Sequence, residues 1–292
     1  MASLQDIRRR IRSVKNTQQV TKAMKMISAV KLRKSQERLL SLRPFATMLH
    51  EMVGRVLGRF ESVDTIPHDS LAHAFFSPRE EKCIHIVVIA SDKGLCGGFN
   101  SGLLKAADAF IRQCPGQVTA CDVIGRRAAD WARKSGIKTS FEANSANPSD
   151  FTKLARGIAE RASKAYIAGE IDALYLVFNR FNSAVSQSPM ETKVFPPTER
   201  PAGGSGGGVE HLLEPDPETV LRELLPHYIE NEIFHALLES FTSEHAARMA
   251  AMDKATSNAA DMIDSLTLHM NKVRQAAITS QIIEVVSGAA TS

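Results

Sequence analysis

Proline and glycine are missing from both ends of this sequence. No proline precedes Pro44 and no glycine precedes Gly54, and after Pro226 the chain has no further proline and only one glycine, Gly288. Inside a helix, proline costs about 3 kcal/mol and glycine about 1 kcal/mol. Their absence therefore predicts a long, uninterrupted helix at each end of the chain.

The two terminal helices are expected at roughly residues 3–57 and 227–287. At about 1.5 Å per residue, each would be about 80–90 Å long, whereas a small domain is only about 30 Å across. Most of each helix is therefore expected to project beyond any domain that it belongs to.

Long apolar runs and cysteine pairs are also lacking. No stretch of about 18 apolar residues occurs, so no transmembrane helix is expected, and the first residues lack the apolar segment of a secretory signal. We expect an uncleaved chain in a bacterial cytoplasm. No Cys-x-x-Cys spacing occurs, which favours free, buried thiols, and no two histidines lie three or four residues apart, as a helical metal site requires. The four cysteines are Cys83, Cys96, Cys114 and Cys121.

Signatures of catalysis are absent as well. The sequence contains no G-x-S-x-G and no local Ser-His-Asp or Cys-His grouping. The glycine-rich segment 94–98 follows a predicted strand and precedes a predicted helix, where phosphate loops lie, but it matches neither G-x-G-x-x-G nor the P-loop pattern. A tight turn or a protein-contact loop is favoured there over a nucleotide site. We expect no enzyme activity of this chain, no cofactor and no metal.

Charge is distributed unevenly along the chain. Residues 1–45 hold 12 basic and 2 acidic residues, a net charge of +10, whereas residues 227–292 hold 4 basic and 8 acidic residues, a net charge of −4. The two terminal helices are therefore predicted to pair with each other, antiparallel, within one chain. The alternative is that each helix packs on its own domain.

Apolar spacing supports this pairing. The C-terminal helix carries a heptad seam with steps of three and four, which is typical of a coiled coil. Its members are Met249, Met252, Thr256, Ala259, Ile263, Leu266, Met270, Val273 and Ala277. The N-terminal seam begins at Leu4, Ile7, Ile11 and Val14, shifts to Val20, Met24 and Ile27, and resumes at Leu32, Leu39 and Leu42. We expect this N-terminal stripe to drift around the helix because a second surface is contacted.

The middle of the chain predicts an α/β domain with a mostly parallel, Rossmann-like sheet, because strand and helix patterns alternate. Strands are expected at 84–89, 118–124, 138–141, 172–179 and 185–194, and helices at 101–113, 126–134 and 149–168, the last capped by Ser149. The Gly- and Pro-rich segment 196–208 is predicted to be a flexible linker or loop. The predicted domains are a coiled-coil helix at 1–60, the α/β domain at 75–200, a linker at 201–226 and a second coiled-coil helix at 227–292.

The basic N-terminal helix leaves three interpretations open. It can bind nucleic acid electrostatically, it can be a solvated helix surface, or it can meet an acidic protein partner. No aromatic residue lies between its basic residues before Phe45, so the stacking surface that a single-strand binder needs is absent. The basic residues are Arg8, Arg9, Arg10, Arg12, Lys15, Lys22, Lys25, Lys31, Arg33 and Lys34.

Several separated segments resemble one family, the γ subunits of bacterial-type F-type ATP synthases. They are Asn16–Met26 with Lys31–Lys34, the loop Ser91–Asn100, the segment Ser243–Met252, and the C-terminal segments Arg274–Thr279 and Glu284–Ala289. The matches cover both ends and the middle, in the right order. Between residues 105 and 242 the match is mostly one of pattern and length.

The resemblance implies the central-stalk rotor subunit of an ATP synthase, present as one copy per complex. Its coiled coil would lie inside three α and three β subunits, and its α/β domain would contact the ε subunit and the membrane c-ring. It implies a peripheral protein on the cytoplasmic face of the inner membrane, without membrane insertion and without nucleic acid. A basic coiled-coil nucleic-acid-binding protein and a Rossmann-like nucleotide-dependent enzyme remain the alternatives.

The resemblance also implies which residues meet the α and β subunits. Lys25, Lys31 and Lys93 would face an acidic loop of β, and Cys96 lies in the same characteristic loop as Lys93. Met24 would lie where the shaft passes through the surrounding sleeve. Near the C-terminus, Arg274, Gln275 and Thr279 would face another β loop, although Ser280 stands where many members have Gln.

Overall fold

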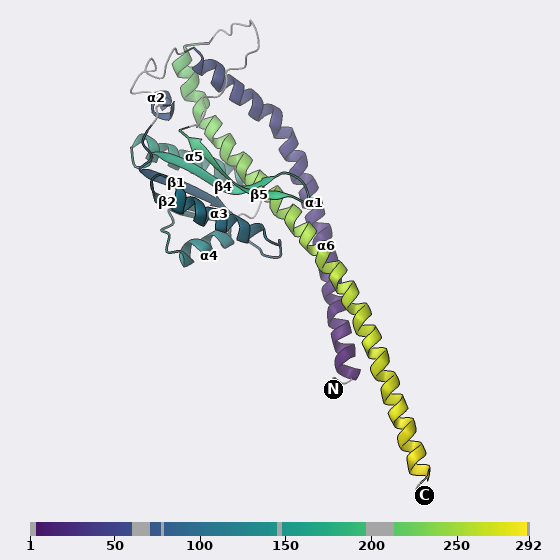
Figure 1. Ribbon diagram of the computed structural model, residues 1–292. Coiled ribbons are helices and arrows are strands. Elements are labelled where there is room, and N and C mark those ends of the chain that lie inside the picture. The colour runs from purple at the N-terminus through teal and green to yellow at the C-terminus, as the bar shows by residue number, and fades with distance from the viewer. Residues whose placement is uncertain (1–3, 60–70, 77–78, 145–147, 197–212, 291–292) are drawn as a thin grey trace. The chain divides into compact units, whose positions relative to one another are not determined.

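A computed structural model describes residues 4–59, 71–76, 79–144, 148–196 and 213–290 of the chain (Figure 1). The helices are α1 (Leu4–Leu57), α2 (Leu71–Phe76), α3 (Phe99–Gln113), α4 (Arg126–Lys134), α5 (Phe151–Ile167) and α6 (Pro217–Ala290). The strands are β1 (Cys83–Ile89), β2 (Gln117–Ile124), β3 (Phe141–Ala143), β4 (Ala173–Phe181) and β5 (Gln187–Phe195). The two long terminal helices are therefore confirmed.

The chain divides into two compact units, and the division falls inside both long helices. One unit consists of residues 1–30 and 248–292, and the other of residues 31–247. We expected the helices to form domains of their own, with limits at 60 and 227. Instead, the inner part of each helix belongs to the same unit as the sheet.

The second unit, residues 31–247, is built around a five-stranded sheet in the order β3-β2-β1-β4-β5. The pairs β1–β2, β1–β4 and β2–β3 are parallel, and only β4–β5 is antiparallel. The predicted mostly parallel sheet is thus confirmed. The single antiparallel pair follows from the short connection between β4 and β5, which is too short for the crossover that parallel strands require.

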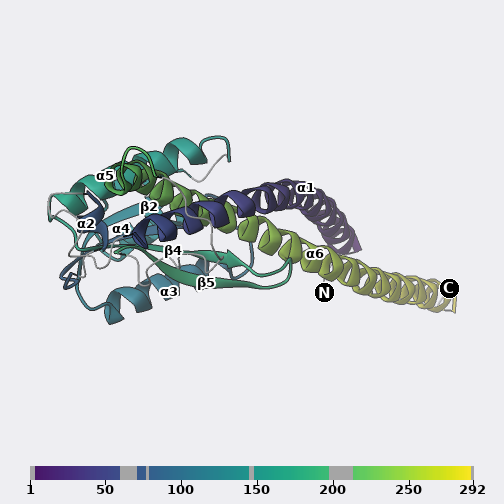
Figure 2. The same cartoon turned by 90° about the horizontal axis from the view of Figure 1, so that it is seen from above.

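Both faces of the sheet are covered, with α3 on one side and α5 on the other (Figure 2). Side chains alternate between the faces, so Ile84, Ile86 and Val88 pack with α3 and α4, while Val87 and Ile89 face α5. This explains why β1 reads as a continuous apolar run.

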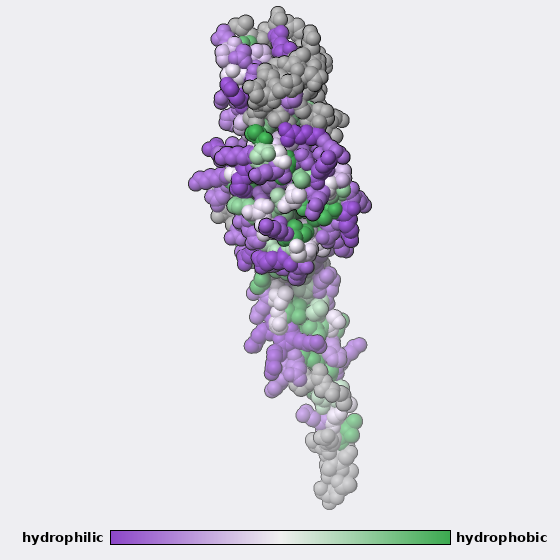
Figure 3. Space-filling view, turned by 90° about the vertical axis from the view of Figure 1, so that its left-hand side faces the viewer, coloured by the Kyte–Doolittle hydropathy of each residue, from purple (hydrophilic) through white to green (hydrophobic). Residues whose placement is uncertain are grey.

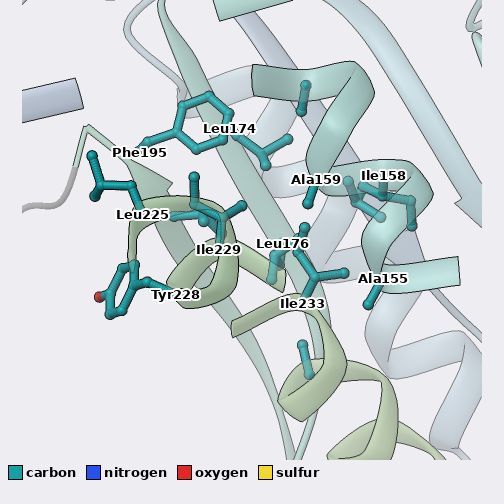
Figure 4. Close-up of a cluster of buried hydrophobic side chains, with 14 of the residues drawn as sticks. Ala155, Ile158, Ala159, Leu174, Leu176, Phe195, Leu225, Tyr228, Ile229 and Ile233 are labelled. Atoms are coloured by element: carbon teal, nitrogen blue, oxygen red, sulfur yellow. The ribbon is translucent and has the colours of Figure 1, made fainter. Parts of the chain in front are cut away.

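The long helices complete the core on the α5 side. Leu49, Val53, Val56 and Leu57 of α1 belong to this core. From α6 it includes Leu221, Leu225, Tyr228, Ile229 and Ile233. Ile229 and Ile233 face Leu176 of β4 and the side chains of α5, whereas Tyr228 points away from them (Figure 4). Because these side chains bury their apolar surface on the sheet, the inner parts of α1 and α6 cannot be separated from the α/β unit. The alternative that each helix packs on its own domain is therefore correct for these inner parts.

The start of α6 was predicted wrongly. The helix begins at Pro217, so the last ten residues of the expected linker, 217–226, are helical. Asp216 caps it, since its Oδ1 accepts the Thr219 amide proton at 2.8 Å, and proline fits the first helical position. Pro226 lies inside the helix, where the burial of Leu221, Leu225 and Ile229 offsets the lost amide hydrogen bond. Residues 197–212 of the predicted linker lie outside the described residues.

Smaller differences concern the middle domain. The strand expected at 138–141 lies at 141–143, and the helix α2 was not predicted. Ser149 does not cap α5, because the helix begins at Phe151 and its N-cap residue is Asp150, which makes no side-chain capping bond. The other elements begin and end within a few residues of their predicted limits.

In the first unit, α1 and α6 run antiparallel. The Thr256 hydroxyl lies 2.8 Å from the Thr21 hydroxyl, and the Lys25 ammonium lies 2.6 Å from Asp253 Oδ1. Residue numbers thus rise along α1 as those of the paired residues on α6 fall. The predicted seam from Met249 to Val273 is covered, as expected, and only Ala277 is exposed. The described part of α1 begins at Leu4, and extending the pairing places Leu4 opposite about residue 273 of α6.

The predicted drift of the N-terminal stripe is wrong. Most of the covered side chains of α1 in this unit keep a regular spacing of three and four, at Leu4, Ile7, Ile11, Val14, Gln18, Thr21, Lys25 and Ser28, and Met24 and Ala29 beside them are half-buried. Of the three residues that we assigned to the shifted stripe, Val20 and Ile27 are 58% and 59% exposed, whereas Met24 is half-buried. The seam therefore stays on one face of the helix but becomes mostly polar from Gln18 to Ser28, while Val20 and Ile27 lie on an exposed face.

Candidate partner-binding surfaces

The loop 91–100 follows β1 at the carboxyl edge of the sheet. Parallel α/β sheets bind their ligands at this edge, next to the strand where the chain order reverses, and β1 is that strand here. Asn100 organises the loop: its Oδ1 accepts the Ser91 amide proton at 3.1 Å, and its Nδ2 lies 3.1 Å from the Cys96 sulfur. The Ser91 hydroxyl, 2.8 Å from the Lys93 carbonyl and 2.9 Å from Asn100 Oδ1, can donate to either.

The neighbouring loop after β2 closes against this one. Gly125 has a φ of 92°, and a Cβ at this position would lie only 2.2 Å from the Ala90 carbonyl oxygen. No other residue type fits such a close approach of two backbones. The amides of Arg126 and Arg127 donate to Asp92 Oδ1 and to the Ser91 carbonyl, each at 3.1 Å. Because these amides are used within the protein, the edge is organised as a folded contact loop rather than as an open phosphate cradle.

The predicted site residues of this loop differ in accessibility. Lys93 is exposed, whereas Cys96 is buried, with 2% exposure, among Ser91 and Asn100. Leu95 between them is 64% exposed. Sequence reasoning did not single out Leu95, because an exposed leucine leaves no signal in a glycine-rich segment.

All four cysteines are free, as predicted, but only Cys96 and Cys121 are buried. Burial raises the pKa of the Cys121 thiol to about 12, and the carboxylate of Asp122 beside it adds to the shift. A thiol of this kind is not ionised at neutral pH and is a poor nucleophile. Among the residues that the structure describes, no cluster of three or more His, Cys, Asp or Glu side chains is arranged to hold a metal ion.

Three cations of α1 converge in the second unit. Lys31, Lys34 and Arg38 line a cavity of about 280 Å³ together with Ser149 and Phe241. Their spacing of three and four residues places them on one face of the helix. Among the described residues none of the three forms an ion pair, so their charges are available to an acidic partner. Of these, the sequence indicated Lys31 as a contact residue, and only the fold adds Ser149 and Phe241.

In the first unit, Lys25 is paired within the chain. Its ammonium lies 2.6 Å from Asp253 Oδ1, and both side chains are substantially exposed. An exposed pair of this kind contributes about 0–1 kcal/mol, so a partner carboxylate can replace Asp253 at little cost. Met24, one residue earlier, is half-buried.

The outer face of α1 in this unit is unusually apolar. Val20, Ile27 and Val30 are 58%, 59% and 70% exposed, and together with Ala23 they repeat the spacing of three and four residues that a helix uses to pack on another surface. From the sequence we expected a second contacted surface on this helix, but we assigned Val20 and Ile27 to a drifting seam rather than to a separate stripe. Elsewhere, Figure 3 shows hydrophilic side chains predominating on the face that it draws, with apolar ones scattered among them.

The C-terminal site residues lie on the outer part of α6. Arg274, Gln275 and Thr279 are exposed, beyond the residues of α6 that pair with the described part of α1. The Thr279 hydroxyl donates to the backbone carbonyl of Gln275 at 2.9 Å. No helix among the described residues is both long and apolar enough to cross a membrane.

These features define a class of protein: an α/β unit and an antiparallel helical pair that presents charged and apolar contact surfaces. The sequence model of the ATP synthase family matches residues 3–291. The ATP synthase gamma chain of Solibacter usitatus is 48% identical over 292 residues, covering 100% of both chains, and that of Pelotomaculum thermopropionicum is 43% identical over 290 residues, covering 99% of both. The chain therefore belongs to the ATP synthase gamma chain family.

Solved structures agree on the fold. The chain is similar to the Euglena gracilis mitochondrial ATP synthase OSCP/F1/c-ring structure in rotational state 3, with a TM-score of 0.68 and 17% identity over 99% of this chain and 94% of that one. The rotor structure of the same organism gives a TM-score of 0.64 at 18% identity, covering 94% and 98%. The resemblance found in the sequence motifs is confirmed. The chain is a non-catalytic stalk subunit, and the nucleic-acid-binding and nucleotide-dependent alternatives give way to this assignment.

Proposed function

We propose that one copy of this chain transmits torque between a proton-driven c-ring and the catalytic β subunits of a bacterial ATP synthase. The full-length 48% identity to an ATP synthase gamma chain carries this proposal. The proposed partners are three α and three β subunits, the ε subunit and the c-ring, at the cytoplasmic face of the inner membrane. No ATP is bound by this chain, because the chemistry takes place on β.

The contact residues that we propose lie on α1, in the loop 91–100 and on the outer part of α6. Lys31 with Lys34 and Arg38, and Lys93 in the loop 91–100, meet acidic segments of β, while Lys25 exchanges Asp253 for a β carboxylate. Exposed ion pairs are weak, about 0–1 kcal/mol each, which suits a contact that is broken at every step of rotation. Met24 on α1, and Arg274, Gln275 and Thr279 on α6, contact the sleeve of α and β subunits.

Cys96 takes part indirectly. Because its sulfur is buried and accepts from Asn100, we propose that it supports the partner contact by holding the loop in shape.

Co-expression of this chain with α and β subunits tests the proposal. A stable complex with Mg-ATPase activity is expected, and a tag on this chain should rotate when ATP is hydrolysed. If no such complex forms around the chain, the proposed function fails.

Charge reversal tests the basic surface separately. Lys31→Glu should leave assembly intact and lower the torque-coupled ATPase activity several-fold, since it places like charges together. Lys134→Glu, at an exposed lysine in the last turn of α4, is the matched control and should have little effect. Equal effects of the two substitutions would contradict the proposed role of Lys31.

A further inference from the structure

Leu95 combines two unusual properties. Among the described residues, it is the one non-glycine residue with a positive φ, 63°, and its side chain is 64% exposed. A residue with a Cβ is strained in this left-handed conformation, and leucine has no polar side chain that could compensate locally. With 64% of its surface exposed, the side chain is also only partly buried within the chain. The fold thus bears strain for a side chain that does little for its own stability.

The loop holds the backbone at Leu95 in place. Behind it, Ser91, Cys96 and Asn100 form the hydrogen-bond cluster described above, and the Phe99 amide donates to the Cys96 carbonyl at 3.3 Å. The conformation of Leu95 is therefore fixed by its neighbours on both sides. A backbone that is already held in place loses little conformational entropy when a partner covers it, so more of the burial of Leu95 is available for binding.

The surroundings of Leu95 are basic. Lys93, Arg126 and Arg127 are all exposed at this edge of the sheet, and Asp92 is the carboxylate among them. The absence of a side chain at Gly94 makes room for the Arg127 guanidinium, since a Cβ there would lie 3.0 Å from Arg127 Nη2. A partner complementary to this surface has an apolar socket with an acidic rim.

We propose that Leu95 is the apolar anchor of the contact between this chain and an acidic segment of a β subunit. This inference rests on the proposed function, which supplies the partner. Lys93, Arg126 and Arg127 attract and orient the acidic segment, and Leu95 enters an apolar socket within it. The strain at Leu95 fixes the direction of the anchor, and burial in the complex provides the stabilisation that the free chain lacks.

Leu95→Asn separates these two effects. Asparagine tolerates the left-handed conformation but is polar, so the full-length chain should unfold at the same temperature as the wild type or higher. Its affinity for the α and β subunits, measured by titrating the chain and following assembled Mg-ATPase activity, should fall about tenfold or more.

Two further variants complete the experiment. Leu95→Met keeps an apolar side chain and should retain affinity within about threefold of the wild type. Val185→Asn, at a residue that is 88% exposed in the turn between β4 and β5, removes an exposed apolar side chain elsewhere and should leave affinity unchanged.

The outcomes are distinguishable. If the wild-type chain forms no complex with α and β, the proposed function fails and this inference with it. If the wild type assembles but Leu95→Asn binds equally well, the anchor is refuted while the proposed function stands. A clear fall in the unfolding temperature of Leu95→Asn would instead make Leu95 a residue of the chain's own fold and would also overturn the inference.

Discussion

The two compact units of this chain are stabilised in different ways. In the unit of residues 31–247, a sheet is buried on both faces, and side chains such as Ile86, Leu174 and Phe195 have no exposed surface. In the unit of residues 1–30 and 248–292, two helices meet along a single seam, which includes polar members such as Thr21 and Ser28. A thick apolar core gives the α/β unit a large reserve of stability, whereas the helical pair depends on a narrow strip of contacts.

The difference also affects what each unit exposes. The helical pair leaves Val20, Ile27 and Val30 exposed, although burying them would stabilise it. A monomeric coil gains nothing from such residues, whereas a coil that is surrounded by partners does. The comparison therefore indicates that the helical pair is stabilised partly by its partners and the α/β unit by itself.

The largest expected effect is in the α/β core. Phe195→Ala removes a fully buried ring that packs edge-on against Phe75 and Tyr166, and should lower the free energy of unfolding by about 3–5 kcal/mol. Urea unfolding followed by the fluorescence of Trp131, the one tryptophan of the chain, measures it within this unit. A loss below about 1 kcal/mol would show that the core is not the main source of stability.

A smaller and more local effect is expected in the helical pair. Met252→Ala removes a seam residue that is 5% exposed and should cost about 2 kcal/mol, at the low end for such substitutions. Hydrogen exchange should rise in residues 4–28 and 249–273, while the Trp131 unfolding transition stays in place. Met262→Ala, at a residue 53% exposed on the same helix, is the control. If Met252→Ala also destabilises the Trp131 unfolding transition by about 2 kcal/mol, the two units do not unfold separately.

The pH dependence of the α/β unit provides a third comparison. Burial raises the pKa of Glu232 on α6. Glu232 therefore binds its proton more tightly in the folded chain than in the unfolded chain. As pH rises from the pKa of Glu232 in the unfolded chain to its pKa in the folded chain, the free energy of unfolding falls. Glu232→Gln should therefore raise the melting temperature at neutral pH and have little effect at acidic pH. Glu223→Gln, at an exposed position of α6, should change the melting temperature at neither pH.

The smallest effect is expected at the exposed ion pair of the helical pair. Asp253→Asn removes the partner of Lys25 and should cost no more than about 1 kcal/mol, with the cost disappearing at high salt. Hydrogen exchange of residues 18–28 at low and high salt measures it. A larger, salt-independent loss would mean that this pair, rather than the apolar seam, holds the register of the two helices.

Much of the fold could be predicted because it is encoded locally. Helix length follows from the missing prolines and glycines, and the seam from Met249 to Val273 follows from periodicity alone. The order of strands and helices in the middle followed from alternating patterns, because each element shows its own period. The start of α6 was missed because Pro226 looked like a boundary, and only the burial of Leu221 and Leu225 on the sheet explains why the helix runs through it.

The contact surfaces were less predictable. Lys31 and Lys93 could be chosen from charge and resemblance, but the cavity around Lys31 needs Ser149 and Phe241, which lie more than a hundred residues away. The drift expected for the α1 stripe was wrong because a polar stretch of the seam, Gln18–Ser28, was taken for a change of face. Hydrophobic spacing cannot distinguish a polar seam from an exposed surface, since only the partner helix decides which side is covered.

By itself, the sequence determined two long helices, their antiparallel partnership and the family to which the chain belongs, because propensity, charge and motif are all local properties. Only the tertiary structure decided that the boundary between the units lies inside both helices, at residues 30 and 247. It alone decided which of the four cysteines are buried and that Leu95 is strained and exposed. These depend on which distant side chains fill the space around each residue, and that is settled only when the sheet and the helices pack together.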